Sequence, residues 1–153
     1  MWISPTDAQV QKVYKEIASA VLPTNLVQSQ KASSGDAEIV FTNGSKILFR
    51  SAHSENNLRG YAVNYMVVDE AAFVKRTTIE EIILPMLTVR GKKCLLMSTP
   101  KGKNWFFEYL QMADSMKGWR RFRFTAYDSP LIDEEFINNQ KKILTMELLL
   151  RSI

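Results

Sequence analysis

Short apolar runs and stretches with helical periodicity alternate along the chain. Apolar runs bounded by polar residues, a pattern typical of buried strands in a parallel sheet, occupy Met1–Ile3, Met66–Val68 and Lys93–Met97. Between and after them, apolar residues recur every three or four positions, which predicts helices with one buried face. The alternation predicts an α/β fold with three αβα layers and a mostly parallel sheet. The helical apolar positions are Val10, Val13, Tyr14, Ile17, Val21 and Leu22, then Ile79, Ile82, Ile83, Met86 and Leu87, then Phe106, Tyr109, Leu110 and Ala113, and last Phe136, Ile137, Ile143 and Leu144.

Start and stop signals accompany these predicted helices. A Ser, Thr, Asn or Asp before a helix accepts hydrogen bonds from its free amides, and a Gln or Glu three residues later completes a capping box. Pro23 and Pro85 are expected to end or kink the first and second helices. The start signals are Thr6 with Gln9, Thr77 with Glu80, Asn104, and Asp133.

Further strands are predicted outside this alternation. Two β-prone segments, Glu38–Phe41 and Lys46–Phe49, flank Asn43-Gly44, and Asn-Gly between apolar runs is a strong hairpin signal. We expect this hairpin to be an antiparallel insertion in the sheet, with a short strand near Leu26–Gln28 before it. A last strand is predicted over Trp119–Phe124, with Trp119, Arg121 and Arg123 on one face and Arg120, Phe122 and Phe124 on the other.

The composition is that of an ordinary globular domain. With 153 residues, 46% of them hydrophobic, the chain is long enough for a single domain over residues 1–153. The net charge of +4 permits a phosphate-rich partner without requiring one. The single cysteine, Cys94, is expected to be buried in an apolar strand, and it excludes a disulfide framework. Without a signal peptide or a run of about 18 apolar residues, we expect a soluble cytoplasmic protein with no membrane partner.

Candidate chemistry follows two of the predicted strands. Asp69 and Glu70 come directly after Met66–Val68, and Ser98-Thr99-Pro100 ends the next parallel strand. Ligands bind beyond the carboxyl ends of strands in open α/β sheets, and two adjacent carboxylates that leave water need a cation or hydrogen bonds. A Mg²⁺ ion with a bound polyphosphate would suit Asp69, and Glu70 would then polarise an attacking water. The hydroxyls of Ser98 and Thr99 would sense the terminal phosphate, with Pro100 stiffening their loop.

Several motifs in collinear order carry a resemblance to a known family. They are ISPT near the start, the NGS hairpin, LRG before the acidic strand, VVDEAAF, ILPML and STPKGKNWF. In this order they resemble the ATPase domain of the large terminase subunit, the DNA-packaging motor of tailed bacteriophages. The resemblance implies a P-loop NTPase fold of the additional-strand, catalytic-glutamate class. It also implies roles for single residues: Asp69 as the Walker B magnesium ligand, Glu70 as the catalytic glutamate, Ser98, Thr99 and Pro100 as the coupling motif, and Arg59 as an arginine acting on a neighbouring subunit's nucleotide.

The resemblance implies cofactors and partners as well. In the intact parent these are Mg²⁺ and ATP, double-stranded DNA, the portal and the small terminase subunit. A P-loop of the form GxxxxGK followed by Ser or Thr is expected before the first strand, and these residues contain neither it nor a nuclease domain with metal-binding aspartates. We therefore expect a fragment of phage or prophage origin that alone holds no cofactor tightly and hydrolyses ATP negligibly. Uncovered sheet edges are expected to favour a homo-oligomer.

Two other function classes fit parts of the sequence. A fragment of a DEAD-like helicase would share the acidic strand end and a Ser-Thr loop, but helicases typically carry Asp or His where Ala72 stands and Ser-Ala-Thr in place of Ser98-Thr99-Pro100. The other alternative is a non-catalytic module that binds DNA or a protein. Its candidate phosphate contacts are Lys101, Lys103, Arg120, Arg121 and Arg123, although a charged edge strand also explains the three arginines.

Overall fold

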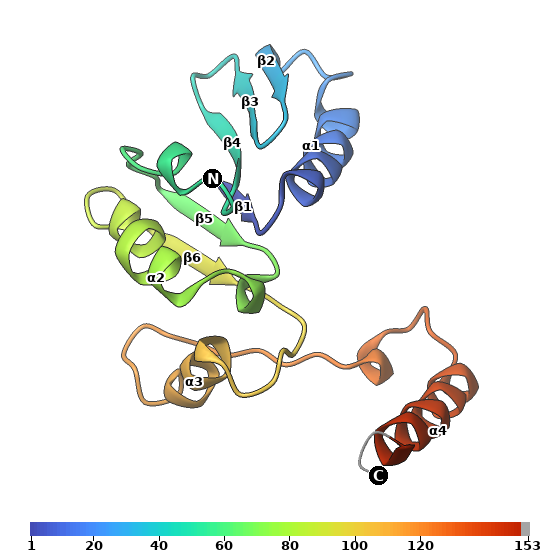
Figure 1. Cartoon of the computed structure of the whole chain (residues 1–153). Coiled ribbons are helices and arrows are strands. Elements are labelled where there is room, and N and C mark those ends of the chain that lie inside the picture. Colours follow the sequence, from blue (N-terminus) through green and yellow to red (C-terminus); the bar gives the residue numbers. More distant parts are fainter. Residues whose placement is uncertain (151–153) are drawn as a thin grey trace. The chain divides into compact units, whose positions relative to one another are not determined.

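The computed structural model describes residues 1–150, and the chain divides into two compact units, Met1–Gln111 and a second one from Met112 onward (Figure 1). Helix α3 (Trp105–Met112) reaches the boundary, and the second unit adds η5 (Ala126–Asp128) and α4 (Glu134–Leu150). The first unit carries every strand of the described residues. Its elements are β1 (Trp2–Ser4), α1 (Asp7–Val21), β2 (Val27–Ser33), β3 (Asp36–Phe41), β4 (Lys46–Ser51), η1 (Glu55–Asn57), β5 (Tyr65–Val68), η2 (Ala71–Phe73), α2 (Arg76–Thr78), η3 (Ile79–Ile83), η4 (Leu84–Leu87) and β6 (Lys93–Leu96).

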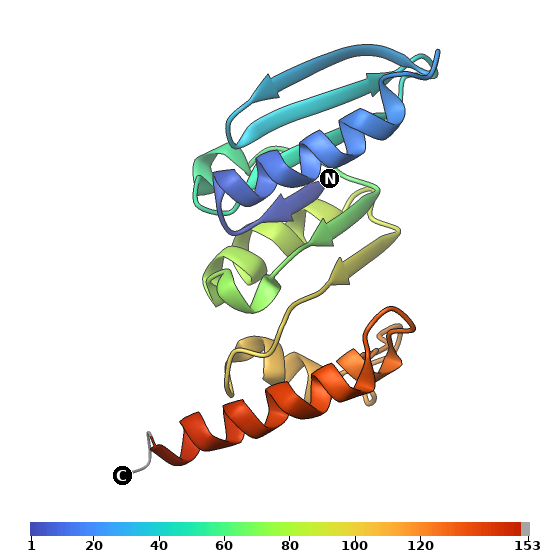
Figure 2. The same cartoon turned by 90° about the vertical axis from the view of Figure 1, so that its right-hand side faces the viewer.

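The strands of the first unit form one sheet in the order β2-β3-β4-β1-β5-β6 (Figure 2). Strand β1 pairs in parallel with β4 and β5, and β5 pairs in parallel with β6, whereas β2, β3 and β4 pair antiparallel. The mostly parallel α/β fold and its antiparallel hairpin are thus confirmed. Since β4, β1, β5 and β6 run in the same direction, their carboxyl ends meet at one edge of the sheet, where ligand sites are expected.

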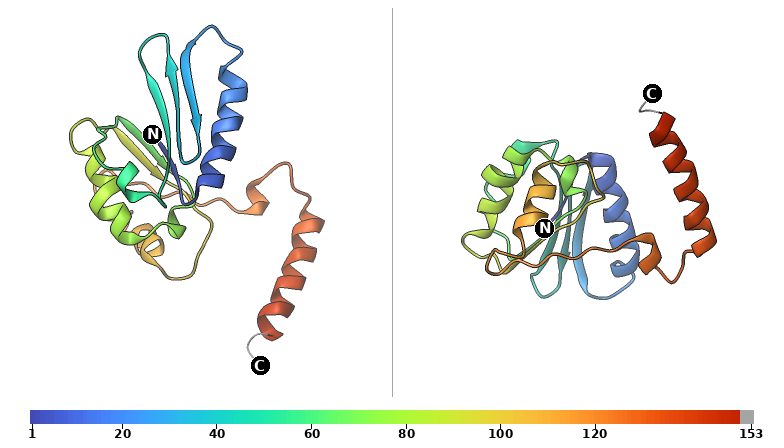
Figure 3. Two further views of the ribbon diagram at one scale, coloured as in Figure 1. Left: turned by 45° about the horizontal axis from the view of Figure 1, so that its top comes forward. Right: turned by 90° about the horizontal axis from the view of Figure 1, so that it is seen from below.

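Helices cover both faces of this sheet (Figure 3). Neighbouring strand residues point to opposite faces, so Trp2 packs toward α1 while Ile3 packs toward the other layer. On the α1 face, the rings of Tyr14 and Phe49 meet edge to face with centroids 5.5 Å apart. The opposite face packs against the segment from α2 to η4 and against α3. The buried side chains of that layer include Ile3, Met66, Val68, Ile79, Ile82, Ile83, Met86 and Phe106.

The first helix and the hairpin form as their local sequences predict. At the start of α1, the Thr6 hydroxyl accepts a hydrogen bond from the Gln9 amide (3.3 Å), and the Thr6 amide donates to Gln9 Oε1 (3.1 Å). Gly44 has φ +80°, a conformation that glycine adopts without a steric cost and that the turn between β3 and β4 requires. The strand expected near Leu26–Gln28 is longer than predicted, because β2 pairs along the whole of β3.

The capping box predicted at Thr77 and Glu80 is wrong. The helix begins after Lys75, which provides no side-chain cap, and Glu80 instead accepts hydrogen bonds from Arg76 and Tyr109. The backbone then widens into the π-helical turn η3 and tightens into the 3₁₀ turn η4, where Pro85 offers no amide donor. Pro85 was predicted to end or kink this helix; it lies in the 3₁₀ turn, and the helical run ends two residues later, at Leu87. The prediction of the helix start failed because longer-range partners take the Glu80 carboxylate.

The strand predicted over Trp119–Phe124 is also wrong. This stretch belongs to no strand, and the side chains of Phe122 and Phe124 are 65% and 81% exposed. A strand needs a partner for its amides and carbonyls, and no strand described within residues 1–150 pairs with it. The alternating pattern alone was not sufficient to form a strand.

The caps predicted for the last two helices are confirmed. Asn104 Oδ1 accepts hydrogen bonds from the amides of Phe106 (3.1 Å) and Phe107 (3.3 Å), and Asp133 Oδ1 accepts one from the Glu135 amide (2.9 Å). Among residues 1–150, none of the helices has the length and apolar character that crossing a bilayer demands.

Replacing Phe49 tests the layer between α1 and the sheet. Phe49 is fully buried, so Phe49→Ala is expected to lower the free energy of unfolding by about 3–5 kcal/mol through lost burial and a residual cavity. Urea unfolding followed by circular dichroism measures this change. The matched control is Phe124→Ala, whose 81% exposed ring should change stability by no more than about 0.5 kcal/mol. Equal effects of the two substitutions would contradict this account of the core.

Candidate functional site

Polar residues stand at the carboxyl ends of the four parallel strands. Ser4 ends β1, Ser51 ends β4, Asp69 follows β5, and Ser98 follows β6 after one further residue. Ser4 and Ser51 are buried, and the Asp69 amide donates to the Ile3 carbonyl (2.8 Å), which extends the pairing of β5 with β1 to the acidic pair. The sheet therefore brings the two predicted motifs, Asp69-Glu70 and Ser98-Thr99, to adjacent strand ends.

Glu70 has a left-handed backbone conformation, with φ 48° and ψ 44°. It is the one residue other than glycine with positive φ among the described residues. Such a conformation costs about 1–3 kcal/mol and persists where surrounding contacts impose it. One such contact follows immediately, because the Ala71 amide donates to the Met97 carbonyl (2.9 Å) and so ties the turn after β5 to the end of β6. No signal in the sequence indicates this conformation, since glutamate does not favour it.

The Glu70 carboxylate is held by three donors from the coupling motif. Its Oε2 accepts hydrogen bonds from the Ser98 hydroxyl (3.1 Å), the Thr99 amide (3.2 Å) and the Thr99 hydroxyl (3.0 Å). Within the described residues, no hydrogen bond reaches Oε1. One carboxylate oxygen is thus fixed by the protein, and the other is left to accept a proton or a hydrogen bond from a bound molecule.

The loop after β6 is tied along its length to the turn after β5. The Lys101 ammonium lies 4.4 Å from the centre of the Phe73 ring, and Asn104 Nδ2 donates to the Ala72 carbonyl (3.0 Å). The indole N–H of Trp105, the first residue of α3, donates to the Val74 carbonyl (2.9 Å). The start of α3 is therefore connected to the Glu70 turn by short, direct interactions.

Asp69 is the candidate metal ligand. Desolvation raises the pKa of its carboxyl above the ordinary 3.8, the hydrogen bond from the Glu70 backbone opposes this, and the Glu70 charge adds to it. A desolvated carboxylate beside a second acid suits a cation. No cluster of three or more His, Cys, Asp or Glu side chains able to hold a metal occurs in the described part of the chain. Mg²⁺ is commonly held by one or two protein carboxylates together with waters and phosphates, and a single carboxylate such as Asp69 fits this pattern.

Arg59 lies in the loop between η1 and β5. Together with Gly60, Tyr61, Glu81, Ile82, Pro85 and Met86 it lines an open pocket of about 210 Å³. The acidic pair and the coupling motif are not among the residues that line this pocket. The side chain of Arg59 is exposed.

Of the other basic candidates, two lie in the loop after β6 and three lie in the second unit. Lys101 stacks on Phe73, and Lys103 is exposed in the same loop. Arg120, Arg121 and Arg123 are exposed in the second unit, where Arg121 pairs with Asp114 at 2.7 Å. With no strand there, the faces predicted for these arginines do not exist.

Sequence reasoning missed a buried arginine close to the Arg59 loop. Arg50, the penultimate residue of β4, is only 3% exposed, and its guanidinium donates to the Tyr61 hydroxyl. One signal was present in the sequence. In the alternation of the hairpin strand, Arg50 follows the core residue Phe49 and so lies on the opposite, also helix-covered face of the sheet.

Comparison with known proteins yields one consistent family. A family model described as phage terminase large subunit matches residues 4–149. The large terminase subunit of Thermus phage G20c is 33% identical over 137 residues, which cover 77% of this chain and 27% of that protein. The large terminase subunit of Escherichia phage T5 is 28% identical over 123 residues, covering 78% of this chain and 28% of that protein. This chain thus spans little more than a quarter of the length of these curated relatives.

Solved structures share the fold. The ATPase domain of the Thermus phage P74-26 large terminase matches with a TM-score of 0.55 and 24% identity, over 78% of this chain and 54% of that one. The large terminase of a thermophilic bacteriophage, solved in complex with ADP, matches with a TM-score of 0.66 and 18% identity, over 92% of this chain and 35% of that one. At these identities the two structures support the α/β fold.

The charged Asp69 carboxylate is expected to lower the free energy of unfolding at neutral pH. A raised folded-state pKa means that the folded protein binds a proton more tightly than the unfolded chain, so stability falls as pH rises from the ordinary 3.8 through the raised value. Asp69→Asn removes this loss and should be more stable than the parent at pH 7 by about 0.5 kcal/mol, a figure reduced for solvent screening. The difference should vanish toward pH 3, as measured by urea unfolding across pH.

Asp36 provides a control of opposite sign. Its pKa is lowered, chiefly by the hydrogen bond from Lys31, so its charge contributes stability above the ordinary 3.8 that is lost as pH falls. Asp36→Asn should therefore be less stable than the parent at pH 7 and approach it in acid. Profiles of the same sign for the two variants would contradict the assignment of Asp69 as a desolvated carboxylate.

Proposed function

This chain belongs to the phage terminase large subunit family, and we propose that it supplies the magnesium-binding and water-activating side of an ATP hydrolysis site in a DNA-packaging motor. The proposal rests on the hydrogen bonds that Ser98 and Thr99 donate to the carboxylate of Glu70, the residue next to Asp69. This arrangement places an acid, its neighbouring acid and two hydroxyl donors at adjacent ends of parallel strands. The family match favours this function over that of a helicase fragment.

The proposed chemistry divides between the two acids. Asp69 would hold Mg²⁺, which when bound neutralises phosphate charge during hydrolysis. Glu70 would accept a hydrogen bond from the attacking water and take its proton. Its Oε1 has no hydrogen bond within the described residues, so a water can reach this oxygen while Ser98 and Thr99 keep Oε2 in place. The two hydroxyls thereby orient the base of the reaction.

The phosphate-binding part of such a site lies outside these residues. No glycine-rich stretch followed by Lys-Ser or Lys-Thr occurs in the 153 residues, and backbone amides of such a loop supply much of the phosphate affinity. The terminase solved in complex with ADP is matched over 35% of its length. We propose that this chain contributes to ATP and Mg²⁺ binding only together with a P-loop segment, and that alone it holds neither tightly.

The proposed partners follow from the motor function. Double-stranded DNA is the translocated substrate, and the portal and the small terminase subunit are the protein partners. Arg59 would act on the nucleotide of a neighbouring subunit, which is consistent with its exposure. Lys101 and Lys103 remain candidate phosphate contacts on the coupling loop. The arginines of the second unit are weaker candidates, because Arg121 is already paired with Asp114.

Glu70→Gln tests the catalytic assignment in a polypeptide that joins these residues to a P-loop segment. The amide oxygen of Gln can still accept hydrogen bonds from Ser98 and Thr99, but it cannot take a proton. Steady-state phosphate release should fall by about 10²–10⁴-fold, while binding of a fluorescent ATP analogue is retained. The control is Glu16→Gln on the exposed side of α1, which should leave both measurements unchanged. Full turnover in Glu70→Gln would exclude Glu70 as the base.

The free edge of β6 is the proposed position for an additional strand. Strand β6 ends the sheet, Cys94 is exposed there rather than buried as predicted, and Leu95 is 48% exposed. A parallel strand at this edge would place its carboxyl end beside Ser98, where a P-loop would be needed. In the 153-residue chain the same edge is proposed to pair with a second copy.

Leu95→Lys tests this edge. A lysine on an edge strand opposes pairing, so the substitution should weaken self-association of the 153-residue chain at least about tenfold, as measured by light scattering over a concentration series. Leu131→Lys is the control, since Leu131 is 92% exposed and belongs to no strand. A parent chain that stays monomeric at the highest concentration would refute the pairing.

A further inference from the structure

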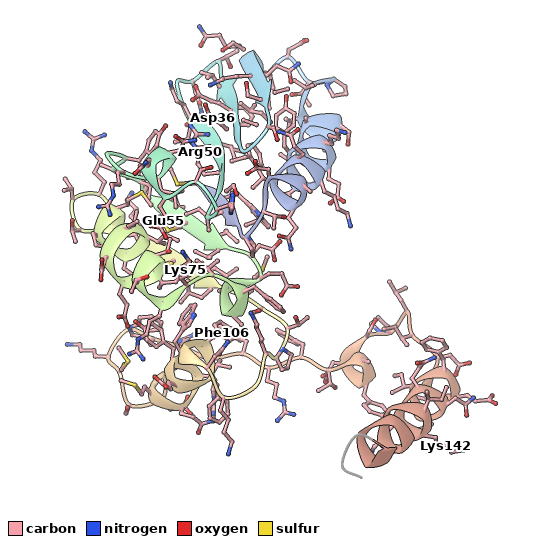
Figure 4. The ribbon with its side chains drawn as sticks, viewed as in Figure 1. Asp36, Arg50, Glu55, Lys75, Phe106 and Lys142 are labelled. Atoms are coloured by element: carbon pink, nitrogen blue, oxygen red, sulfur yellow. The ribbon has the colours of Figure 1, made fainter. Side chains whose placement is uncertain are left out.

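Arg50 is a buried charge that the proposed hydrolysis site does not use. It lies near the end of β4 with 3% of its side chain exposed, opposite Asp36 of β3 (Figure 4). Taking a guanidinium out of water is costly unless its donors find partners. The contacts of its guanidinium therefore indicate which parts of the fold Arg50 connects.

The Nη1 group of Arg50 connects the strands of the hairpin. Nη1 donates to the carbonyls of Ala37 (2.8 Å) and Phe49 (3.0 Å) and pairs with the Asp36 carboxylate (2.9 Å). Asp36 is in turn paired with Lys31 of β2. This branch thus joins β2, β3 and β4.

The other branch reaches out of the sheet to the loop that carries Arg59. Nη2 donates to the Tyr61 hydroxyl (3.0 Å), and the guanidinium carbon lies 5.1 Å from the centre of the Tyr61 ring. Nε is buried without a hydrogen-bond partner among the described residues. The contacts of Arg50 thus depend on the planar fork formed by its two Nη groups, since Nε makes no hydrogen bond. A lysine has no such fork and cannot reproduce these contacts.

Tyr61 is the main attachment of the loop between Leu58 and Val63. Leu58 is fully buried, and the Val63 amide donates to the Met86 carbonyl (3.2 Å), so both ends of the loop are fixed. Between them, Arg59 and Gly60 are exposed, and Gly60 has φ +88°. Within this loop, which lies wholly in the described part of the chain, the bond from Arg50 is the one side-chain hydrogen bond that the structure gives.

We propose that Arg50 is a positioning residue that sets the location of Arg59 through Tyr61. The hairpin provides a rigid base, the guanidinium fork connects this base to the phenol, and the phenol fixes the loop two residues after Arg59. The significance for catalysis rests on the proposed role of Arg59 toward a neighbouring subunit. The positioning of the loop by Arg50 does not depend on that role, and it can be tested without ATP.

Trypsin cleavage of the Arg59–Gly60 bond in the full chain reports on this attachment. A protease needs several residues around the bond to leave the folded surface, so cleavage follows local opening of the loop. Tyr61→Phe keeps the ring over the guanidinium and removes the hydroxyl acceptor of a charged donor. Cleavage after Arg59, followed by mass spectrometry under native conditions, is expected to become about tenfold faster, and the Tm is expected to fall by a few degrees, because the lost hydrogen bond also stabilises the fold as a whole.

Tyr127→Phe is the matched control. It also removes one tyrosine hydroxyl, which donates to Asn138 Oδ1 (3.1 Å) in the second unit, and it should leave cleavage after Arg59 unchanged. Cleavage after Arg120 and Arg123, in an exposed stretch, provides an internal standard within each digest. An unchanged rate after Arg59 in folded Tyr61→Phe overturns the proposal.

Arg50→Lys separates positioning from a purely structural role. It keeps the charge but loses the fork, so it is expected to accelerate cleavage after Arg59 about as much as Tyr61→Phe does, and the double variant should add nothing further. A lower Tm with no selective increase at the Arg59 bond would show that Arg50 only stabilises the hairpin, and would overturn the proposal. If the bond is released as expected while Arg59→Ala leaves ATP turnover of a P-loop-containing polypeptide intact, the positioning stands and the proposed role of Arg59 fails.

Discussion

Three hydrogen bonds onto one carboxylate oxygen of Glu70 fix the loops after β5 and β6 against each other. The left-handed backbone of Glu70 costs about 1–3 kcal/mol, and a hydrogen bond to a charged group contributes about 1.5–3 kcal/mol when well shielded. Even after a reduction for the exposure of Thr99, three such bonds outweigh the backbone cost. These bonds, together with the bond from the Ala71 amide to the Met97 carbonyl, can hold Glu70 in a backbone conformation that glutamate does not favour.

The same contacts determine which neighbouring segments would move together with the Glu70 side chain. A ligand that draws the carboxylate away must break the bonds from Ser98 and Thr99 or take their loop along. That loop is joined to Ala72, Phe73 and Val74, and it continues directly into Trp105 of α3. No distant pathway is needed to connect the acid with the helix, because every step is a direct contact between neighbouring segments.

The sequence was informative wherever a local rule decides the outcome. Strand β5, strand β6 and the turn at Gly44 follow from apolar runs and turn chemistry, and Asp69, Glu70, Ser98 and Thr99 were placed together because parallel strands end at one edge. The failures have a different origin. Glu80 was assigned to a cap, yet Arg76 and Tyr109 take its carboxylate, and Trp119–Phe124 alternates like a strand without a partner to pair with among the described strands. Partners distant in sequence decide such cases, as they do for the buried Arg50.

Features that cost stability occur at the carboxyl end of β5 and along the outer edge of β6. Asp69 is desolvated, Glu70 has a strained backbone, and β6 leaves Leu95 exposed. Features that cost stability are expected at functional sites, where a ligand or a further element can compensate for them. On the hairpin side of the sheet, Arg50 is also a costly buried group with an unpartnered Nε, but its contacts to β3, β4 and Tyr61, together with the Lys31–Asp36 pair, connect three strands and a loop. The uncompensated features beside β6 favour this edge as the place for the proposed nucleotide and additional strand, and the connected hairpin is the frame from which Arg59 would be presented to a neighbour.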